Sequence, residues 1–279
     1  MLPHHIITRR AIFIGCPGER GVDFLPGVQK DLQNFPELLC SESGGKFVPD
    51  EIVTLLNPTP EQLTSVIHSS AADYTLVYFS GHGYTDAYGI RRLCFEGYSI
   101  PDTFLLDRSP RQLVIVDACR NYISGAAIGA IGNLSDPYDH ATGSPVRDLF
   151  DQWIADSPAG KMIIHATAPG TYAGDTKTGG VFTKALLRIM MNYEANDGYV
   201  PVSPKVVLHH VCDTLDTQTP EVVYSEGHLT VPLAIGKPQE VLSDYVLSAR
   251  PVQTQVAPGS GGVSLVLLGL LLVGCITTR

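Results

Sequence analysis

The sequence predicts an α/β protein built on a mostly parallel sheet, and three observations support this fold class. The 279 residues are 44% hydrophobic and 17% charged, which is the composition of a chain that folds around a sizeable core. Short, nearly continuous apolar runs alternate with stretches of helical periodicity, as in sheets that are covered by helices on both faces. The 27 glycines and 20 prolines are spread through the chain, which suits the many turns of such a fold.

The first elements follow this alternation closely. Ala11–Cys16 is an apolar run of strand length, and Gly27–Leu39 has helical spacing, with Pro36 as the point where the helix is expected to break. Glu51–Leu56 and Tyr74–Phe79 are the next two expected strands. Two strands on either side of a helix are typical of a parallel crossover unit.

The helix between the second and third strands has a clear start signal. Thr59 is a suitable N-cap, Pro60 fits the first helical position, and Gln62 can complete a capping box. We expect this helix to run to about Ala72. The remaining expected elements are a hairpin around Arg92–Tyr98, strands at Gln112–Val116, Lys161–Ala166 and Thr230–Ile235, and helices at Val181–Tyr193 and Ser203–Leu215.

Charge and composition exclude several classes of function. A formal net charge of −9 argues against a protein that grips nucleic acid through a basic surface. The six cysteines are widely spaced without a CxxC pair, so we expect free thiols rather than a disulfide scaffold. We also expect no metal and no cofactor, because no histidine cluster has zinc-ligand spacing and the Gly15–Gly21 segment departs from a nucleotide-binding motif.

Two chemically active residues follow neighbouring strands of the predicted sheet. His82 lies between Gly81 and Gly83, directly after the third strand, and Cys119 follows the fourth. Taken alone, His82 could be a turn histidine with a structural hydrogen bond, and Cys119 could be a buried cysteine that serves only packing. Because parallel strands end at one edge of the sheet, the two would meet there, and a thiolate nucleophile needs such a base. The backbone N–H groups of Gly83 and Cys119 could then stabilise an oxyanion.

These motifs resemble the caspase-like peptidases, the group of caspases, metacaspases and paracaspases. The segments YFSGHG and VIVDACR occur in the family's order, histidine before cysteine, although DACRN departs from the caspase QAC motif and only 37 positions separate residues 82 and 119. The segments KMIIHATAPGTYAGD, GGVFTKALL, TQTPEV and VPLAI resemble the small-subunit half of bacterial members. The likeness covers roughly residues 9–237.

The resemblance implies a caspase-like α/β/α sandwich, with a mostly parallel central sheet, that cleaves peptide bonds. Cys119 would attack the scissile carbonyl, His82 would protonate the leaving amine, and the substrate would lie extended as an added strand. The expected peptidase domain spans residues 1–240. It comprises a large-subunit-like half at about 1–120, a loop at about 121–160 and a small-subunit-like half at about 161–240. No activating partner is evident in the sequence.

The resemblance also implies a pocket for the substrate residue P1. In metacaspases an acid two positions before the nucleophile lines this pocket, which here is Asp117, and Asp175 matches a second acid from the small-subunit half. Two carboxylates predict Arg or Lys at P1. The alternatives are a structural role for Asp117, an acidic P1 held by Arg20, and a non-catalytic caspase-like scaffold. Arg147 is the candidate for self-cleavage within the connecting loop.

The C-terminal segment has a different composition from the rest of the chain. Residues 241–262 form a linker, uncharged from Val252 to Gly262, and Val263–Ile276 is an apolar run without charge. Fourteen helical residues span about 21 Å, which is less than the roughly 30 Å of a hydrocarbon core, so a buried helix is the alternative. We favour a hydrophobic helix at 263–278 that anchors the protein in the cell membrane in a single pass, with the catalytic domain in the cytoplasm. Arg250 and Arg279 alone do not set its orientation.

Overall fold

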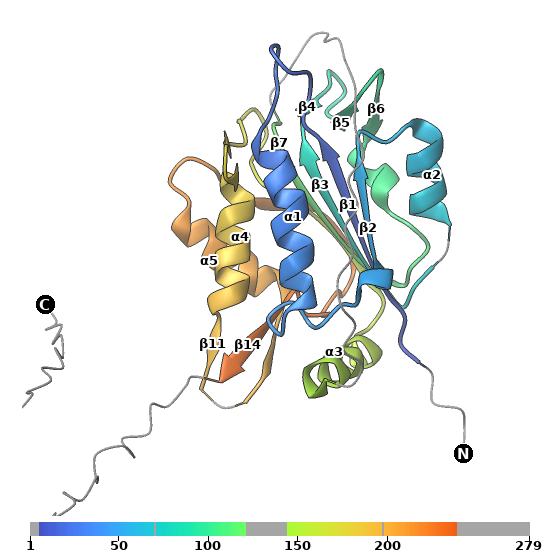
Figure 1. The fold of residues 1–279 in the computed structure, drawn as a ribbon, viewed down its shortest axis with the longest axis vertical. Helices are drawn as coiled ribbons and strands as arrows, with labels where there is room; N and C mark the ends of the chain where they lie inside the picture. The colour runs from blue at the N-terminus through green and yellow to red at the C-terminus, as the bar shows by residue number, and fades with distance from the viewer. Residues whose placement is uncertain (1–5, 70, 121–143, 197, 239–279) are drawn as a thin grey trace, which may run out of the picture. The chain divides into compact units, whose positions relative to one another are not determined.

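A computed structural model describes residues 6–69, 71–120, 144–196 and 198–238 (Figure 1). Its centre is a six-stranded sheet with the order β13-β8-β7-β3-β1-β2, in which only β13 runs antiparallel to its neighbour. The sheet is therefore mixed but mostly parallel, as the sequence predicts. Its strands are β1 (Arg9–Cys16), β2 (Ile52–Leu56), β3 (Tyr74–Gly81), β7 (Arg111–Ala118), β8 (Gly160–His165) and β13 (Glu221–Gly227).

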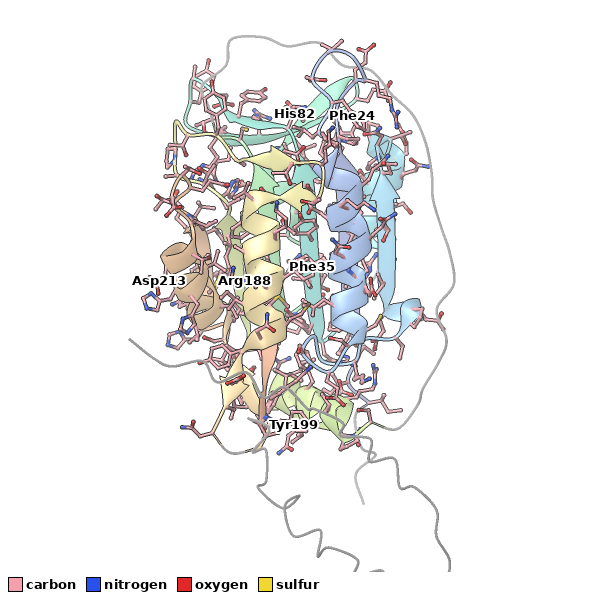
Figure 2. All side chains as sticks on the ribbon, turned by 60° about the vertical axis from the view of Figure 1, so that its left-hand side comes forward. Phe24, Phe35, His82, Arg188, Tyr199 and Asp213 are labelled. Atoms are coloured by element: carbon pink, nitrogen blue, oxygen red, sulfur yellow. The ribbon has the colours of Figure 1, made fainter. Side chains whose placement is uncertain are left out.

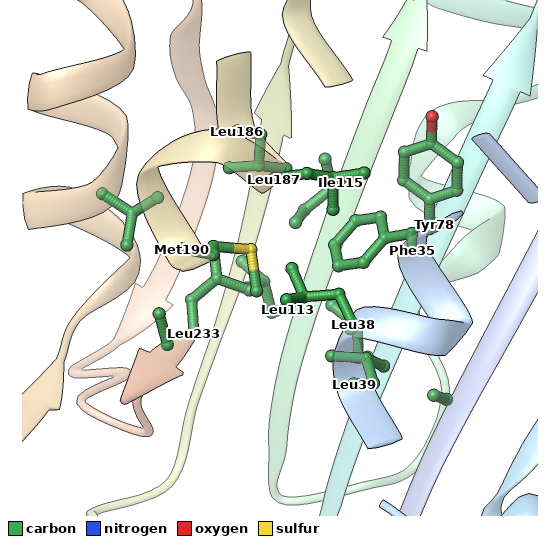
Figure 3. Packing of buried hydrophobic residues seen from close by; sticks show 14 of the residues in the cluster. Phe35, Leu38, Leu39, Tyr78, Leu113, Ile115, Leu186, Leu187, Met190 and Leu233 are labelled. Carbon is green, nitrogen blue, oxygen red and sulfur yellow. The ribbon is translucent and has the colours of Figure 1, made fainter. Parts of the chain in front are cut away.

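Helices cover both faces of this sheet, and each face has its own hydrophobic core. One core joins the sheet to four helices, and Figure 3 shows its centre, where Phe35, Leu113 and Met190 pack together. The other core lies under α2, a short 3₁₀ helix and a β-hairpin. The five helices of the described residues are α1 (Gly27–Cys40), α2 (Pro60–His68), α3 (Pro145–Asp156), α4 (Val181–Asn192) and α5 (Pro204–Thr214).

Helix α1 continues through Pro36, where the sequence predicts a break. Phe35, Leu38 and Leu39 are buried on both sides of the proline. The ring of Phe35 meets those of Phe13 and Tyr78 at centroid distances of 5.4 and 5.0 Å. Packing of this apolar face outweighs the backbone hydrogen bond that a proline removes, so the prediction of a break is wrong.

Helix α2 begins as its sequence predicts and ends earlier. Gln62 N donates to Thr59 Oγ1 at 3.3 Å, and Thr59 N donates to Gln62 Oε1 at 2.9 Å, which completes the expected capping box. The helix ends at His68 instead of about Ala72. Only Leu63 and Ile67 on it are buried, so no core contact extends it further.

The sequence-based assignment is wrong in three places in the second half of the chain. Residues 145–156 form α3, whereas a loop is predicted there; Val146, Phe150 and Ile154 are buried at a spacing of four residues. The last strand is β14 (Ala234–Pro238) instead of Thr230–Ile235, and β13 is not predicted at all. Strand β14 joins a small separate sheet with β11 (Glu194–Ala195) and β12 (Val200–Val202).

The strand register brings the ends of three strands together. Gly81 of β3 pairs with Cys16 of β1 on one side and with Ala118 of β7 on the other. The residues that follow β3 and β7 therefore leave the sheet as neighbours. After β3 the chain forms an antiparallel three-stranded sheet of β4 (Gly83–Thr85), β5 (Arg91–Phe95) and β6 (Tyr98–Pro101), followed by the 3₁₀ helix η2 (Asp102–Leu105). A second hairpin joins β9 (Asp175–Thr176) to β10 (Gly179–Gly180).

The predicted linker and membrane anchor lie outside the described residues. Within residues 6–69, 71–120, 144–196 and 198–238, no helix combines the length and the hydropathy of a membrane span. The hydrophobic helix at 263–278 stays a prediction, and so does the division into domain, linker and anchor.

Candidate functional site

His82 is held by the loop that follows β1. Its Nε2 lies 2.7 Å from the carbonyl oxygen of Asp23 and 3.4 Å from the Oδ2 of the same residue. A carbonyl oxygen only accepts hydrogen bonds, so Nε2 carries a proton and Nδ1 is the nitrogen that remains for chemistry. Figure 2 shows His82 and the nearby loop residue Phe24 at the same end of the central sheet. Gly18 lets this loop approach, because a Cβ there would lie 2.7 Å from His82 Nε2, and its φ is +80°.

Cys119 directly follows β7 and is partly buried. Its Sγ donates a weak hydrogen bond to the carbonyl oxygen of Ala173, at 3.7 Å. Burial raises the pKa of the Cys119 thiol, and the negative charge of Asp117 adds to that effect. In this resting arrangement the thiol is therefore neutral, and it needs a base before it can act as a nucleophile.

The structure brings His82 and Cys119 to the same edge of the sheet, as the sequence predicts, because β3 and β7 are in register up to Gly81 and Ala118. No hydrogen bond joins the two side chains in this described part of the chain. Gly83, the residue after His82, packs closely against the backbone of Cys119: a Cβ on Gly83 would lie 2.9 Å from the carbonyl oxygen of Cys119. The oxyanion role of the Gly83 and Cys119 N–H groups stays a prediction.

Asp117, two positions before the cysteine, is buried among hydrogen-bond donors. Its Oδ2 accepts from Thr183 Oγ1 at 2.6 Å and from Thr183 N at 3.2 Å. The Tyr78 hydroxyl lies 2.7 Å from the same threonine oxygen and completes the network. Burial raises the pKa of Asp117 to about 6, against the effect of Thr183 and with a contribution from Asp175. A carboxyl group in this state changes its charge near neutral pH.

Asp31 is a site residue that the sequence analysis misses. It lies on α1, is 1% exposed, and accepts from Gly180 N at 3.0 Å and from Ser80 Oγ at 3.0 Å. Burial and the charge of Asp117 raise its pKa to about 7. Gly180 lies between the two acids, since a Cβ on it would fall 2.3 Å from Asp117 Oδ2. The available signal was an acid on the apolar face of an amphipathic helix, between Val28 and Leu32.

Asp175 joins this cluster from the β9–β10 hairpin. Its Oδ2 accepts from Gly27 N at 3.2 Å, and its charge raises the pKa values of both Asp31 and Asp117. The structure thus brings the two predicted acids near each other and adds a third. None of the three forms an ion pair with a described lysine, arginine or histidine. Within those same residues no set of three or more His, Cys, Asp and Glu side chains is arranged to hold a metal ion.

The two candidate arginines have other contacts. Arg147 lies in the first turn of α3, where its Nη2 pairs with Glu51 at 2.6 Å and its Nη1 donates to the carbonyl oxygen of Lys46 at 2.8 Å. A helical, ion-paired arginine is a poor cleavage site, because a protease binds its substrate in an extended form. The guanidinium of Arg20 stacks 4.9 Å from the ring centre of Phe24.

Comparison with known proteins agrees with this fold. The chain matches the caspase domain over residues 8–231. The crystal structure of caspase-1 from Spodoptera frugiperda is similar at 19% identity and a TM-score of 0.53, over 85% of this chain and 92% of that one. A protein of Geobacter sulfurreducens, solved by structural genomics, is similar at 15% identity and a TM-score of 0.54, over 79% and 94% of the chains.

No curated protein matches the sequence at a significant level. The solved structures share the fold at identities too low to transfer a substrate. The match to the caspase domain covers most of the chain, and it includes both segments that carry the histidine and the cysteine. The chain belongs to the caspase-domain family of cysteine peptidases.

Proposed function

We propose that this protein is an endopeptidase that cleaves after Arg or Lys with Cys119 as the nucleophile and His82 as the base. The observation that carries the basic preference is the cluster of Asp31, Asp117 and Asp175, which pairs with no cation in the described residues. Asp117 lies on β7, two positions before the nucleophile. Buried carboxylates without a counter-charge favour a cationic ligand. Arginine and lysine are the side chains that supply one.

The proton path follows from the tautomer of His82. Asp23 O holds the proton on Nε2, so Nδ1 is free to take the thiol proton of Cys119. The thiolate then attacks the scissile carbonyl, and the N–H groups of Gly83 and Cys119 donate to the oxyanion. His82 returns the proton to the leaving amine. Water hydrolyses the thioester with His82 again acting as the base.

The acidic cluster is suited to bind the P1 side chain near neutral pH. With pKa values of about 7 for Asp31 and about 6 for Asp117, the cluster holds protons when it is empty. A substrate guanidinium or ammonium would favour the ionised carboxylates and release those protons. Gly180 lets the β9–β10 hairpin approach both acids, because a Cβ at position 180 would lie 2.3 Å from Asp117 Oδ2 and 3.2 Å from Asp31 Oδ2.

A scan of fluorogenic peptides that vary only at P1 tests the proposal. We expect turnover with Arg and Lys and a fall in kcat/KM of at least about thirtyfold in Asp117→Asn, since breaking a buried charge pair costs about 2–5 kcal/mol. Asp107→Asn is the matched control, because Asp107 is equally buried but binds Ser109 at the start of β7. A preference for Asp at P1 would overturn the assignment and favour Arg20 as the specificity residue.

A non-catalytic scaffold is the competing function. A peptidyl electrophile with Arg at P1 should label Cys119 in the wild-type protein and not in His82→Ala. Labelling that ignores both the P1 residue and His82 would support the scaffold. Self-processing needs its own comparison. If the chain is cut by its own activity, the cleavage product should form in the wild-type protein and be absent from Cys119→Ala.

We further propose that Val263–Ile276 anchors the enzyme in the cell membrane, with the catalytic domain in the cytoplasm. The support is its uncharged composition after a linker rich in Gly, Pro and Ser. Full-length protein should sediment with membranes, and a chain that ends at Arg250 should remain soluble and active. If instead full-length protein stays in the soluble fraction and truncation lowers its Tm, the segment is packed in protein.

A further inference from the structure

Two buried polar atoms near the carboxyl end of β7 have no hydrogen-bond partner among the described residues. They are Nε of Arg120, the residue after the cysteine, and Nδ1 of His165, the last residue of β8. Arg120 is 5% exposed and His165 is 1% exposed. A buried polar atom without a partner is costly, and two of them near the end of one strand call for a physical reason.

The protonation state of His165 follows from its one contact. Its Nε2 lies 2.9 Å from Asp102 Oδ2, and Arg91 donates to the same carboxylate. Burial lowers the pKa of His165 against the effect of Asp102, so the ring is neutral and carries one proton. Because a carboxylate only accepts, that proton lies on Nε2. Nδ1 is therefore an acceptor.

The guanidinium of Arg120 lies on the same face of the sheet as the side chain of His165. Its Nη1 donates to Thr167 O at 3.2 Å and pairs with Glu221, which stands directly opposite His165 in the β13–β8 ladder. Side chains that are opposite each other in an antiparallel pair share a face. The Nε–H of Arg120 is thus a donor on the side where His165 presents its acceptor.

We propose that Arg120 Nε–H is linked to His165 Nδ1 through one water molecule that bonds to both, and that His165 is a positioning residue for the nucleophile. The inference rests on the proposed function. Arg120 is also bound through its backbone: its N donates to Thr171 O and its O accepts from Gly170 N, both at 3.0 Å. The same loop supplies Ala173 O to the Cys119 thiol. Asp102 thereby fixes the tautomer of His165, and His165 fixes the residue beside the nucleophile.

Two substitutions of His165 separate its two contacts. Glutamine reaches Asp102 but places no acceptor at the position of Nδ1, whereas asparagine can place an oxygen near that position but does not reach Asp102. We expect His165→Gln to lower kcat about tenfold with little change in KM, because a hydrogen bond to a charged group is lost. His165→Asn should lose no more than about threefold in kcat while lowering the Tm more. The reverse order would overturn the proposal.

A double-mutant cycle provides the second test, and its Arg120→Lys arm remains informative even if a His165 variant folds poorly. Arg120→Lys keeps the charge that faces Glu221 and removes Nε. Alone it should lower kcat about as much as His165→Gln does, and the double variant should be no worse than either single one. Additive losses of kcat would show that the two side chains act independently and would contradict the proposed contact between Arg120 and His165.

A matched control excludes a general loss of stability. Ser109→Ala removes a buried hydrogen bond of 2.7 Å to Thr75 at the other end of β3 and β7. It should lower the Tm and leave kcat within twofold. Alkylation of Cys119 by iodoacetamide gives a readout that needs no substrate: a loosened loop should speed it at least threefold in His165→Gln but not in Ser109→Ala. Unchanged alkylation would contradict the positioning role of His165, and this readout is valid even if the wild-type protein cleaves no peptide. The positioning role and the proposed peptidase function can therefore fail separately.

Discussion

The two ends of the central sheet both bury charge, but they balance it differently. At the amino end, Arg9 is 4% exposed, and it donates to Gly45 O at 2.7 Å and faces Asp151 at 3.2 Å. Its guanidinium also lies 4.6 Å from the ring centre of Phe47. At the carboxyl end, Asp31 and Asp117 receive neutral hydrogen-bond donors only. A buried charge that is paired with a counter-charge has its partner within the fold, whereas a buried cluster of carboxyl groups favours a ligand of opposite charge.

The largest effect on activity should come from the two residues at the carboxyl end that we propose as nucleophile and base. Cys119→Ala and His82→Ala should each lower kcat at least about a thousandfold, since removing a nucleophile or its base leaves only binding and the oxyanion donors. Both variants should unfold at a urea midpoint close to that of the wild type. Substantial peptide turnover by purified Cys119→Ala would end the mechanism proposed here.

The loop that holds His82 should be almost as sensitive. In Gly18→Ala the new Cβ would meet both His82 Nε2 and Asp23 Oδ1, at 2.7 and 2.6 Å, and φ is +80°. We expect about a hundredfold loss of kcat, as for a displacement of about 1 Å in a catalytic group. Gly21→Ala is the matched control: φ there is +86°, but no atom lies within 4 Å of the new Cβ. Equal losses in the two variants would show that backbone strain, and not the contact with His82, is the cause.

The acidic cluster should make stability and activity respond to pH in opposite directions. Because burial raises the folded-state pKa of Asp31 from 3.8 to about 7, the folded protein binds more protons than the unfolded chain in that range. Its contribution to stability is complete below about pH 4 and is lost as the pH rises through 7. Over the same range kcat/KM for Arg peptides should increase, because the carboxylates ionise.

Asp31→Asn sharpens that test, because it removes one titrating group and one like charge from the cluster. Its free energy of unfolding should fall less between pH 5 and pH 8 than that of the wild type. Its kcat/KM for Arg peptides should be lower throughout. Urea denaturation at both pH values measures the first effect. If the free energy of unfolding of the wild type falls no more between pH 5 and pH 8 than that of the variant, the raised pKa of Asp31 is contradicted.

The smallest effect on activity should follow the most disruptive change at the amino end. Arg9→Met leaves Glu51 and Asp151 without their buried partner and should cost about 3 kcal/mol of unfolding free energy. Its kcat/KM should stay within twofold of the wild type at a temperature where the variant is folded. A large loss of kcat in fully folded Arg9→Met would show that the two ends of the sheet are coupled.

The sequence predicted the parts of this protein that depend on local pattern. Four of the five parallel strands are apolar runs buried on both faces, and the fifth, β2, is an apolar edge strand that is only partly buried. The ends of β3 and β7 identify His82 and Cys119. Helix α3 carries its own signal in Val146, Phe150 and Ile154, but it was obscured by the Gly- and Ala-rich stretch that precedes it. The edge strand β13 has no apolar alternation, since its last three residues are exposed, and its register with β8 defines it.

Asp31 was beyond sequence-based prediction for a different reason. On an amphipathic helix an acid normally faces solvent, and its apolar neighbours Val28 and Leu32 alone do not show which groups would satisfy a buried carboxylate. Its burial depends on Gly180, which lies 149 positions further along the chain. Contacts between residues so far apart in the sequence are set by tertiary packing. The contact between Asp23 and His82, which are 59 positions apart, is of the same kind.

The partners of the site have a consequence for synthesis of the protein on the ribosome. Cys119 contacts Ala173, Asp117 contacts Thr183, and Asp31 contacts Gly180, so every one of these partners comes from the last part of the domain to be translated. A nascent chain that has emerged only to residue 160 already contains the histidine and the cysteine, but it has neither the loop that orders the thiol nor the second wall of the acidic cluster. The contact that orders the thiol and the hydrogen bonds that hold the two buried acids can therefore form only after residues 173–183 have been translated.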